Sequence, residues 1–262
     1  TRSYSVTVVQ TCALPICAVV GELCPWIVII TETNVPHKEN LSYLGDGDEA
    51  HMVYQFALPP LILHAFLKTD SSYLQTWAAE VRSPGPGRSF FNFCASHDGI
   101  GVLPARGILP DTELDDVFAA VEKRGGYISL KSTPAGDVPY ELNINYFSAV
   151  SESSLPDPQR IKKFVASQSI LLAMPGVPGI YVHSIIGSEN WREGVEESGI
   201  KRRINRRKLD YEKAQDELST PDTCRERLFA GFEILLMARI AEPAVPPPPE
   251  SRVVPTGTGV FA

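Results

Sequence analysis

From residue 25 onward, short apolar runs alternate along the chain with longer amphipathic stretches. The run at 27–31 is continuous and mostly β-branched, which is typical of a strand buried on both faces of a sheet. The strands predicted in this part are residues 27–31, 51–56 and 90–95, and the helices are residues 58–67 and 73–81. Regular alternation of strand and helix predicts a parallel sheet or a barrel.

The alternation changes between residues 99 and 156. This part is expected to hold a helix, a Gly-Gly turn, two strands and a further turn, and the predicted positions are 111–123 for the helix, 127–131 and 140–146 for the strands and 134–137 for the turn. We interpret it as an insertion on a barrel loop, where binding residues usually gather.

The first pattern returns after residue 156. A helix is predicted at 157–173, a strand at 180–186, and a final amphipathic helix from residue 220 or 221 to 240. The apolar residues of that helix with core spacing are Leu228, Phe232, Leu235 and Leu236. Four strand–helix units make half of an eightfold barrel. The predicted division is 17–98 for the first barrel part, 99–156 for the insertion, 157–242 for the last unit, and 243–262 for a proline-rich linker with the start of another domain.

The first sixteen residues resemble the translation of a sequencing-adapter oligonucleotide, which usually reads V-T-G-V-Q-T-C-A-L-P-I. Only Val8 departs from it. We expect residues 1–16 to be an artefact and native sequence to begin near Cys17. The alternative is a genuine N-terminal strand over residues 4–9.

Composition narrows the class of partner. The net charge of -7 argues against nucleic acid or an anionic membrane as the main partner. A basic cluster at 201–208 is interpreted as a solvated helix face, with phosphate handling as the alternative. Five cysteines without metal-ligand spacing suit a cytoplasmic protein with reduced thiols. The acidic turn at 46–49 lacks the spacing of a calcium loop, so no metal is expected. No redox or nucleotide motif appears, so no cofactor is expected.

Two acids follow predicted strands. Glu32 comes directly after the strand at 27–31, and Asp98 follows His97 after the strand at 90–95. Strand ends deliver catalytic carboxylates to the mouth of a β/α barrel, and paired carboxylates carry out glycosyl transfer. The alternatives are that Glu32 is a solvated strand-end acid and that His97 is a plain strand-end histidine.

Several segments in the same order resemble the second half of the barrel of glycoside hydrolase family 13, the α-amylase clan, and its sucrose-phosphorylase-like branch. The segments are 31–37, 46–56, 96–101 and 141–146, extended by Gly179-Ile180-Tyr181 and Ile204-Asn205-Arg206. The resemblance covers residues 18–245. It implies an α/β fold, a (β/α)8 TIM barrel of which only strands 5–8 are present, with a small insertion after strand 7.

The resemblance assigns roles to the acids. Glu32 matches the general acid/base, which must be held protonated, and we expect the apolar strand end and a neighbouring carboxylate to do this. Asp98 matches the acid that binds sugar hydroxyls and stabilises the transition state, with His97 on the same glucosyl unit. The family's nucleophile, an Asp at the end of strand 4, has no match here, because Glu22 stands in the wrong pattern. We therefore expect this chain to be inactive by itself and its parent to be active.

Further residues match the family's acceptor side. Tyr140 and Glu141 lie where sucrose phosphorylases alternate contacts to phosphate and to the leaving sugar, although Tyr140 could instead be a packing residue. The His183-Ser184 segment resembles the corresponding segment in the branch that acts on phosphorylated or carboxylated acceptors. That branch usually has Asn-Asp where Asn190 is followed by Trp191, a departure that weakens the match there.

The sequence thus predicts a retaining α-glucosyl phosphorylase. Its partners would be inorganic phosphate and an α-glucoside donor. The favoured donors are glucosylglycerate and sucrose 6′-phosphate, and sucrose is the next choice. The alternatives are a hydrolase or transglucosidase of the same family and a non-catalytic degenerate barrel. The sequence specifies no oligomeric state. Half a barrel would expose strand edges and apolar helix faces, so we expect it to fold poorly alone.

Overall fold

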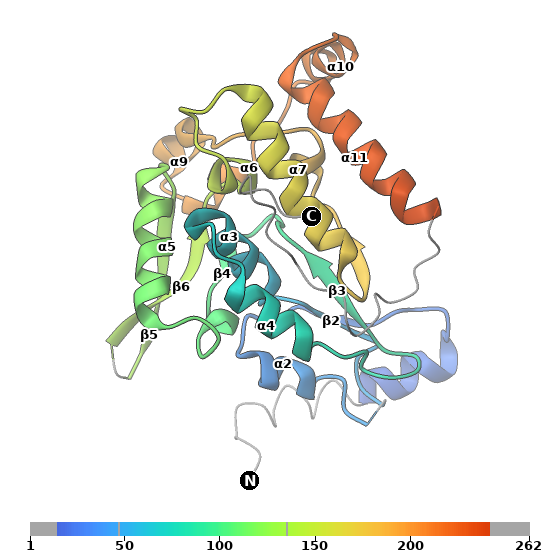
Figure 1. Cartoon of the computed structure of the whole chain (residues 1–262). Coiled ribbons are helices and arrows are strands. Elements are labelled where there is room, and N and C mark those ends of the chain that lie inside the picture. Colours follow the sequence, from blue (N-terminus) through green and yellow to red (C-terminus); the bar gives the residue numbers. More distant parts are fainter. Residues whose placement is uncertain (1–14, 47, 135, 242–262) are drawn as a thin grey trace.

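The computed structural model describes residues 15–46, 48–134 and 136–241 (Figure 1). Most of the predicted adapter segment and the whole of 243–262 lie outside the described residues. The strands are β1 (Ile30–Thr31), β2 (Met52–Tyr54), β3 (Ser89–Phe93), β4 (Ile100–Gly101), β5 (Tyr127–Thr133), β6 (Gly136–Asn143) and β7 (Val177–Gly179). The helices are α2 (His37–Ser42), α3 (Leu58–Lys68), α4 (Ser72–Glu80), α5 (Asp111–Lys123), α6 (Tyr146–Val150), α7 (Asp157–Ala173), α8 (Val182–Ile185), α9 (Arg192–Ser198), α10 (Tyr211–Ser219) and α11 (Cys224–Ala241), with 3-10 turns η1 (Leu103–Ala105) and η2 (Lys201–Asn205).

Four strands form one parallel sheet in the order β1-β2-β3-β7, which is also their order along the chain. Thr31 pairs with Val53, Val53 with Phe90, and Phe91 with Val177. Because all four run the same way, their carboxyl ends meet at one edge of the sheet. The predicted parallel arrangement of strands and helices is therefore present.

Two predicted strands differ from the structure. The run at 27–31 contributes only Ile30–Thr31 to β1, and Ile27 and Val28 are 43% and 55% exposed rather than buried. In the described part of the chain, β1 pairs with a strand on one side only, so it is an edge strand of the sheet. The run at 180–186 is also not a strand: β7 ends at Gly179, and α8 follows. A short apolar run does not distinguish a strand from a helix by periodicity alone.

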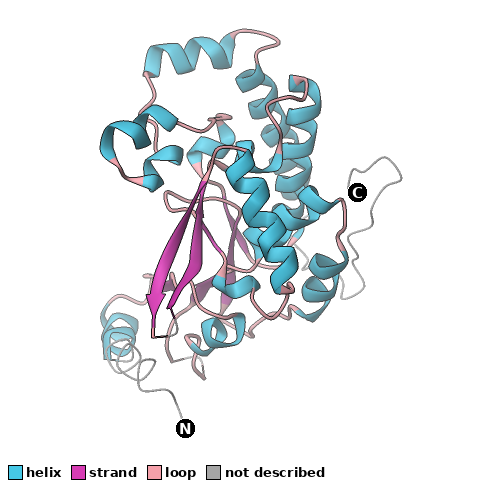
Figure 2. Ribbon diagram, turned by 90° about the vertical axis from the view of Figure 1, so that its left-hand side faces the viewer, coloured by secondary structure: helices cyan, strands magenta, loops and turns pink. Residues whose placement is uncertain are grey.

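Residues 100–143 build a second, antiparallel sheet of order β4-β6-β5, with the helix α5 beside it (Figure 2). The β5–β6 hairpin extends further than the predicted strand at 127–131. The strand predicted at 140–146 ends instead at Asn143, because Asn145 starts the helix α6. Its side-chain oxygen accepts a hydrogen bond from the backbone N–H of Phe147 at 3.0 Å, a standard N-cap.

The core is organised around α3. Every residue of α3 from Leu58 to Phe66 is buried, including Pro59, Pro60 and His64. A helix that is apolar on all sides must be covered on all sides, and α3 contacts β3, β4, α4, α5, α6 and α7. Buried His64 is paired with Glu113 of α5 at 2.9 Å. This central helix joins the two sheets into one packed body.

The final helix α11 is apolar on two sides but packed on one. Leu228 and Phe232 are buried against the rest of the protein, as predicted, and the Phe232 ring lies 6.3 Å from that of Phe164. Leu236, predicted in the core, is 36% exposed, and Ile234 and Met237 are 70% and 66% exposed. Because α11 packs on α7, α8 and α10, its opposite side stays uncovered among the described residues.

Candidate active site

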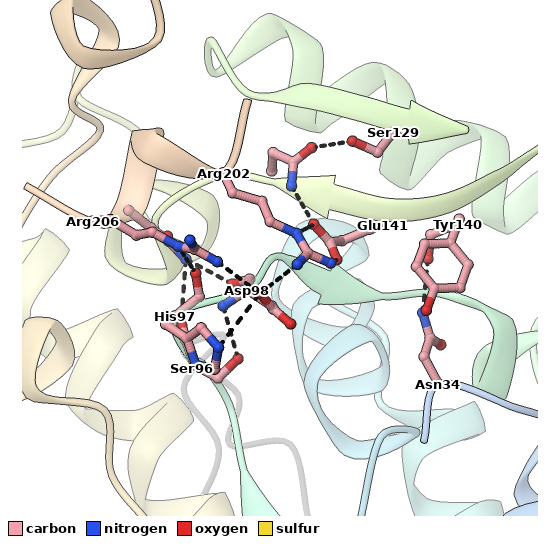
Figure 3. Close-up of polar contacts among 11 residues, drawn as sticks. Asn34, Ser96, His97, Asp98, Ser129, Tyr140, Glu141, Arg202 and Arg206 are labelled. Carbon is pink, nitrogen blue, oxygen red and sulfur yellow. Dashed lines mark hydrogen bonds and ion pairs between the residues drawn. The ribbon is translucent and has the colours of Figure 1, made fainter. Parts of the chain in front are cut away.

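The turn after β3 is fixed in position by its own backbone contacts. The Asp98 N–H donates to the Ser96 hydroxyl at 3.1 Å. The Asn205 side-chain amide, from the end of η2, donates to the carbonyls of Ser96 and Asp98 at 3.1 and 2.8 Å. These bonds connect β3 to a segment more than a hundred residues later and set the direction of the Asp98 side chain (Figure 3).

Asp98 uses one of its two carboxylate oxygens for protein contacts. Its Oδ1 lies 2.7 Å from Nη1 of Arg202, 2.8 Å from Nη2 of Arg206 and 3.7 Å from Nε2 of His97. Its Oδ2 has no partner among the described residues, and the side chain is 27% exposed. Asp98 is therefore held rigidly through Oδ1 and presents Oδ2 to accept a hydrogen bond from a ligand.

Glu141, from β6, is the counter-ion that positions Arg202. It is 3% exposed and forms a bidentate pair, with Nε to Oε1 at 2.9 Å and Nη2 to Oε2 at 2.6 Å. The Asn143 amide also donates to Oε1 at 2.5 Å, and the Ser129 hydroxyl donates to Asn143 at 2.5 Å. This bonding raises the pKa of the Arg202 guanidinium, chiefly through Glu141. Glu141, predicted as a substrate contact, thus lies behind Arg202.

Glu32 stands in different surroundings. It follows β1 directly and is exposed, and no hydrogen bond or ion pair holds its carboxylate among the described residues. Its charge contributes, after burial, to the raised pKa of Tyr54 at the end of β2. The apolar environment and neighbouring carboxylate expected to keep Glu32 protonated are therefore not provided by the described part of the chain.

Tyr140 connects the Glu32 segment to β6 through its backbone. The side-chain amide of Asn34 donates to the Tyr140 carbonyl at 3.1 Å (Figure 3). Gly101 lies against Asn34 so closely that a Cβ there would come within 2.7 Å of its side chain. The half-buried Tyr140 ring has the Lys131 ammonium 5.8 Å from its centroid. Tyr140 and Asn34 thus fix the β1 end beside the antiparallel sheet.

His183 is enclosed in α8 and does not join Asp98. It is 8% exposed, and its Nδ1 lies 2.8 Å from the Ser188 hydroxyl. Burial, followed by the charge of Arg225, lowers the pKa of His183. Its ring lies 5.1 Å from that of Tyr181, whose hydroxyl donates to the carbonyl of Asn205 at 3.1 Å. The link to Asp98 therefore runs through two other residues.

Known proteins that are similar in sequence to this chain are named phosphorylases. No family model matches the chain. It is 59% identical over 245 residues to the glucosylglycerate phosphorylase of Spirochaeta thermophila, covering 94% of this chain and 42% of that protein. It is 43% identical over 224 residues to the glucosylglycerate phosphorylase of Escherichia coli K12, covering 85% of this chain and 40% of the relative.

This chain is a relative of the phosphorylases of glycoside hydrolase family 13. It spans about two fifths of the length of the curated relatives it matches. The structure of sucrose 6F-phosphate phosphorylase from Thermoanaerobacter thermosaccharolyticum superposes with a TM-score of 0.66 at 20% identity. That match covers 80% of this chain and 40% of the neighbour, and it supports the fold, a partial TIM barrel.

The basic cluster at 201–208 of this phosphorylase relative has a role that the sequence alone did not predict. The solvated helix face predicted for residues 201–208 is wrong for two arginines, since Arg202 and Arg206 both pair with Asp98. Pairing across more than a hundred residues leaves no local pattern. The available signal was the resemblance at Ile204-Asn205-Arg206, where Ile204 is fully buried and anchors the turn.

Two further features bear on the type of protein. Among the described residues, no group of three or more His, Cys, Asp or Glu side chains is arranged to hold a metal ion. The described helices include none with the length and apolar character required to span a bilayer.

Proposed function

We propose that this chain is the C-terminal half of the catalytic barrel of a retaining α-glucosyl phosphorylase, with β1, β2, β3 and β7 as barrel strands 5–8. The proposal rests chiefly on Asp98, which is held through Oδ1 by two arginines while Oδ2 remains open. The parallel sheet in chain order and the relatives' names support it. We also place the protein in the cytoplasm, which suits the four free cysteines described.

In this mechanism Asp98 accepts hydrogen bonds from glucosyl hydroxyls through Oδ2. Its negative charge stabilises the positive charge that develops on the sugar ring as the glycosidic bond breaks. The fixed Arg202 and Arg206 prevent Asp98 from reorienting, so this stabilisation requires little rearrangement during the reaction. His97, 62% exposed beside Asp98, lies where it can contact the same sugar.

Glu32 acts as the general acid and then the general base. It protonates the leaving glycosidic oxygen and later removes a proton from the attacking phosphate. Glu32 and Asp98 end strands two positions apart in the sheet, a separation of about 10 Å between strand axes. A retaining mechanism needs a nucleophile about 5 Å from the acid. We assign that nucleophile to a segment outside this chain, so the chain alone is expected to be inactive.

Glucosylglycerate is the donor we favour. Both relatives reported above, at 59% and 43% identity, bear the name glucosylglycerate phosphorylase. The products would be α-glucose 1-phosphate and glycerate. Tyr140 and His183 remain candidates for the acceptor side. His183 is buried, so its contribution would be to shape the loop at Ser188 rather than to touch the acceptor.

The test joins residues 17–262 to the segment that precedes the matched region in the Spirochaeta thermophila relative. This product is called the joined protein below. It is incubated with phosphate and glucosylglycerate, sucrose 6′-phosphate or sucrose, and α-glucose 1-phosphate is assayed. Phosphate-dependent product from glucosylglycerate is the expected result.

Controls separate the chain from the added segment. The added segment alone should form no product, and the joined protein with Glu32→Gln should form it at least about a hundredfold more slowly. Release of free glucose at a rate independent of phosphate would overturn the proposal and identify a hydrolase. Faster product formation from either sucrose compound would retain the phosphorylase and change the donor.

A further inference from the structure

A second polar cavity lies on the helical side of the protein. It has a volume of about 260 Å³ and is formed where α6, α9 and the upper ends of α5 and α7 lie together in Figure 1. The lining residues used below are Lys123, Arg124, Ser148, Glu152, Arg160 and Arg192. None of the residues lining this cavity belongs to the group around Asp98, Glu141 and Arg202. The cavity is therefore separate from the candidate active site.

The cavity is lined by four cations and two acids. The cations are Lys123, Arg124, Arg160 and Arg192, and the acids are Glu152 and Glu189. The balance of four positive against two negative charges is +2. Among the described residues, neither Lys123 nor Arg192 has a carboxylate partner. Asp157, outside the lining, also pairs with Arg160 at 3.4 Å and reduces this excess, and the remaining positive charge favours an anion.

Two of the cations are already fixed. Arg124 is 11% exposed and Arg160 is 9% exposed. Arg124 donates to the backbone carbonyl of Ala149, and the Arg160 guanidinium stacks 4.6 Å from the Phe147 ring centroid. Neither contact involves Glu152 or Glu189. A ligand would therefore lose little free energy to ordering these side chains.

The two acids are poorly held in comparison. Glu152 and Glu189, which pair with Arg124 and Arg160, are 52% and 55% exposed. An exposed ion pair contributes little stability. If these carboxylates rotate into solvent, Arg124 is left to another anion, whereas Arg160 keeps its pair with Asp157 at 3.4 Å. Glu152 and Glu189 thus occupy places that a stronger anionic ligand would take.

Hydroxyl groups add neutral donors to the same cavity. The Ser148 hydroxyl oxygen accepts a hydrogen bond from the Asn190 N–H at 3.2 Å, which leaves its O–H free to donate. Ser153 and Ser154 also line the cavity, and neither hydroxyl has a partner among the described residues. Guanidinium groups combined with several hydroxyls suit the three terminal oxygens of a phosphoryl group better than the two of a carboxylate.

We infer that this cavity binds a phosphate group, either inorganic phosphate or the phosphoryl group of a small phosphate monoester, independently of the site around Asp98. The first test titrates the joined protein with inorganic phosphate by calorimetry, because the chain alone is expected to fold poorly. Lys123→Gln combined with Arg192→Gln removes the two cations without carboxylate partners. We expect this pair to weaken phosphate binding about tenfold, equivalent to about 1.4 kcal/mol.

A matched control has the same charge change elsewhere. Lys38→Gln combined with Arg82→Gln removes one lysine and one arginine that form no ion pair among the described residues, and it should leave the affinity unchanged. Glu152→Gln should tighten phosphate binding, because it removes the competing carboxylate. A gain in affinity cannot arise from misfolding, so this variant tests the proposal even if the double variant unfolds.

Three results would overturn the inference. The first is phosphate binding that is abolished by Arg206→Gln but unchanged by the Lys123 and Arg192 pair, which would place phosphate at Asp98. The second is glycerate binding as tightly as phosphate and with the same response to the variants, which would indicate a carboxylate site. The third is no detectable phosphate binding up to about 10 mM, a concentration that would reveal even millimolar affinity.

Discussion

Asp98 and Glu32 stand at the carboxyl ends of parallel strands in one sheet, yet their surroundings differ in almost every respect. Asp98 is partly buried and fixed by Arg202 and Arg206, and Arg202 is fixed in turn by buried Glu141. Glu32 is exposed and has no hydrogen bond or ion pair among the described residues. The carboxyl end of β3 carries an acid fixed by ion pairs, and the carboxyl end of β1 carries an acid without such contacts in the described part of the chain.

The difference matches the chemistry proposed for each acid. An acid that stabilises charge must stay ionised and oriented, and paired guanidiniums provide both. An acid that exchanges protons must have its pKa set by a specific environment. For Glu32 we assign that environment to segments outside this chain, which spans about two fifths of its relatives. On this proposal, the surroundings of Asp98 come from this chain and those of Glu32 come from other parts of the full barrel.

The largest effect is expected from Glu32→Gln in the joined protein. Loss of the proton donor should lower kcat for phosphorolysis by about 10²- to 10⁴-fold. Initial rates of α-glucose 1-phosphate formation provide the measurement. A Glu32 variant that keeps more than about a tenth of the rate would show that Glu32 is not the acid.

Asp98→Asn should have the next largest effect. The amide keeps the shape but removes the charge that stabilises the transition state, so kcat/KM should fall by about 10²- to 10³-fold. The same assay measures it. His97→Gln serves as the control, because His97 is 62% exposed and 3.7 Å from Asp98, and its loss should cost much less. Equal losses in the two variants would contradict the special position of Asp98.

Glu141→Gln tests whether the fixed arginine matters. A neutral amide cannot keep the bidentate pair with Arg202, and a lost charged hydrogen bond is worth about 1.5–3 kcal/mol. Because Glu141 lies behind Arg202, we expect kcat to fall by about tenfold or more while KM changes little. Steady-state kinetics of the joined protein separate the two parameters.

Ser129→Ala is the matched control for Glu141→Gln. It removes only the hydroxyl that donates to Asn143, one contact further from Glu141, so its effect on kcat should be small. A Glu141 variant that raises KM and leaves kcat unchanged would instead indicate that Glu141 contacts the substrate directly, as first predicted from the sequence.

The sequence predicted best the elements whose signals are local. The helices α5 and α7 begin and end at the predicted residues. In each, a proline at the N-cap is followed by an aspartate in the first turn, where a negative charge is favourable. The apolar runs at 27–31 and 180–186 were misjudged, because their state depends on which neighbours cover them. The same limit explains the site: Glu32 and Asp98 follow strands, but the partners Arg202 and Arg206 are brought to Asp98 only by folding.

The smallest effect is expected for His183, which is buried and, unlike Glu32 and Asp98, does not lie at the carboxyl end of a strand of the parallel sheet. The effect is on stability. Burial lowers its pKa in the folded protein below the unfolded value of about 6.5. The unfolded chain therefore binds this proton more readily, so stability present above about pH 6.5 is lost as the pH falls from about 6.5 through the folded pKa.

His183→Gln removes this titration and keeps a partner for Ser188. Urea unfolding of the joined protein at about pH 7.5 and about pH 5.5 should show a smaller loss of stability for the variant. His37, whose pKa is also lowered by burial, titrates in both proteins and cancels in the difference. An equal loss in both proteins would mean that His183 can be protonated in the folded state without cost, and that its enclosure is looser than the contact with Ser188 indicates.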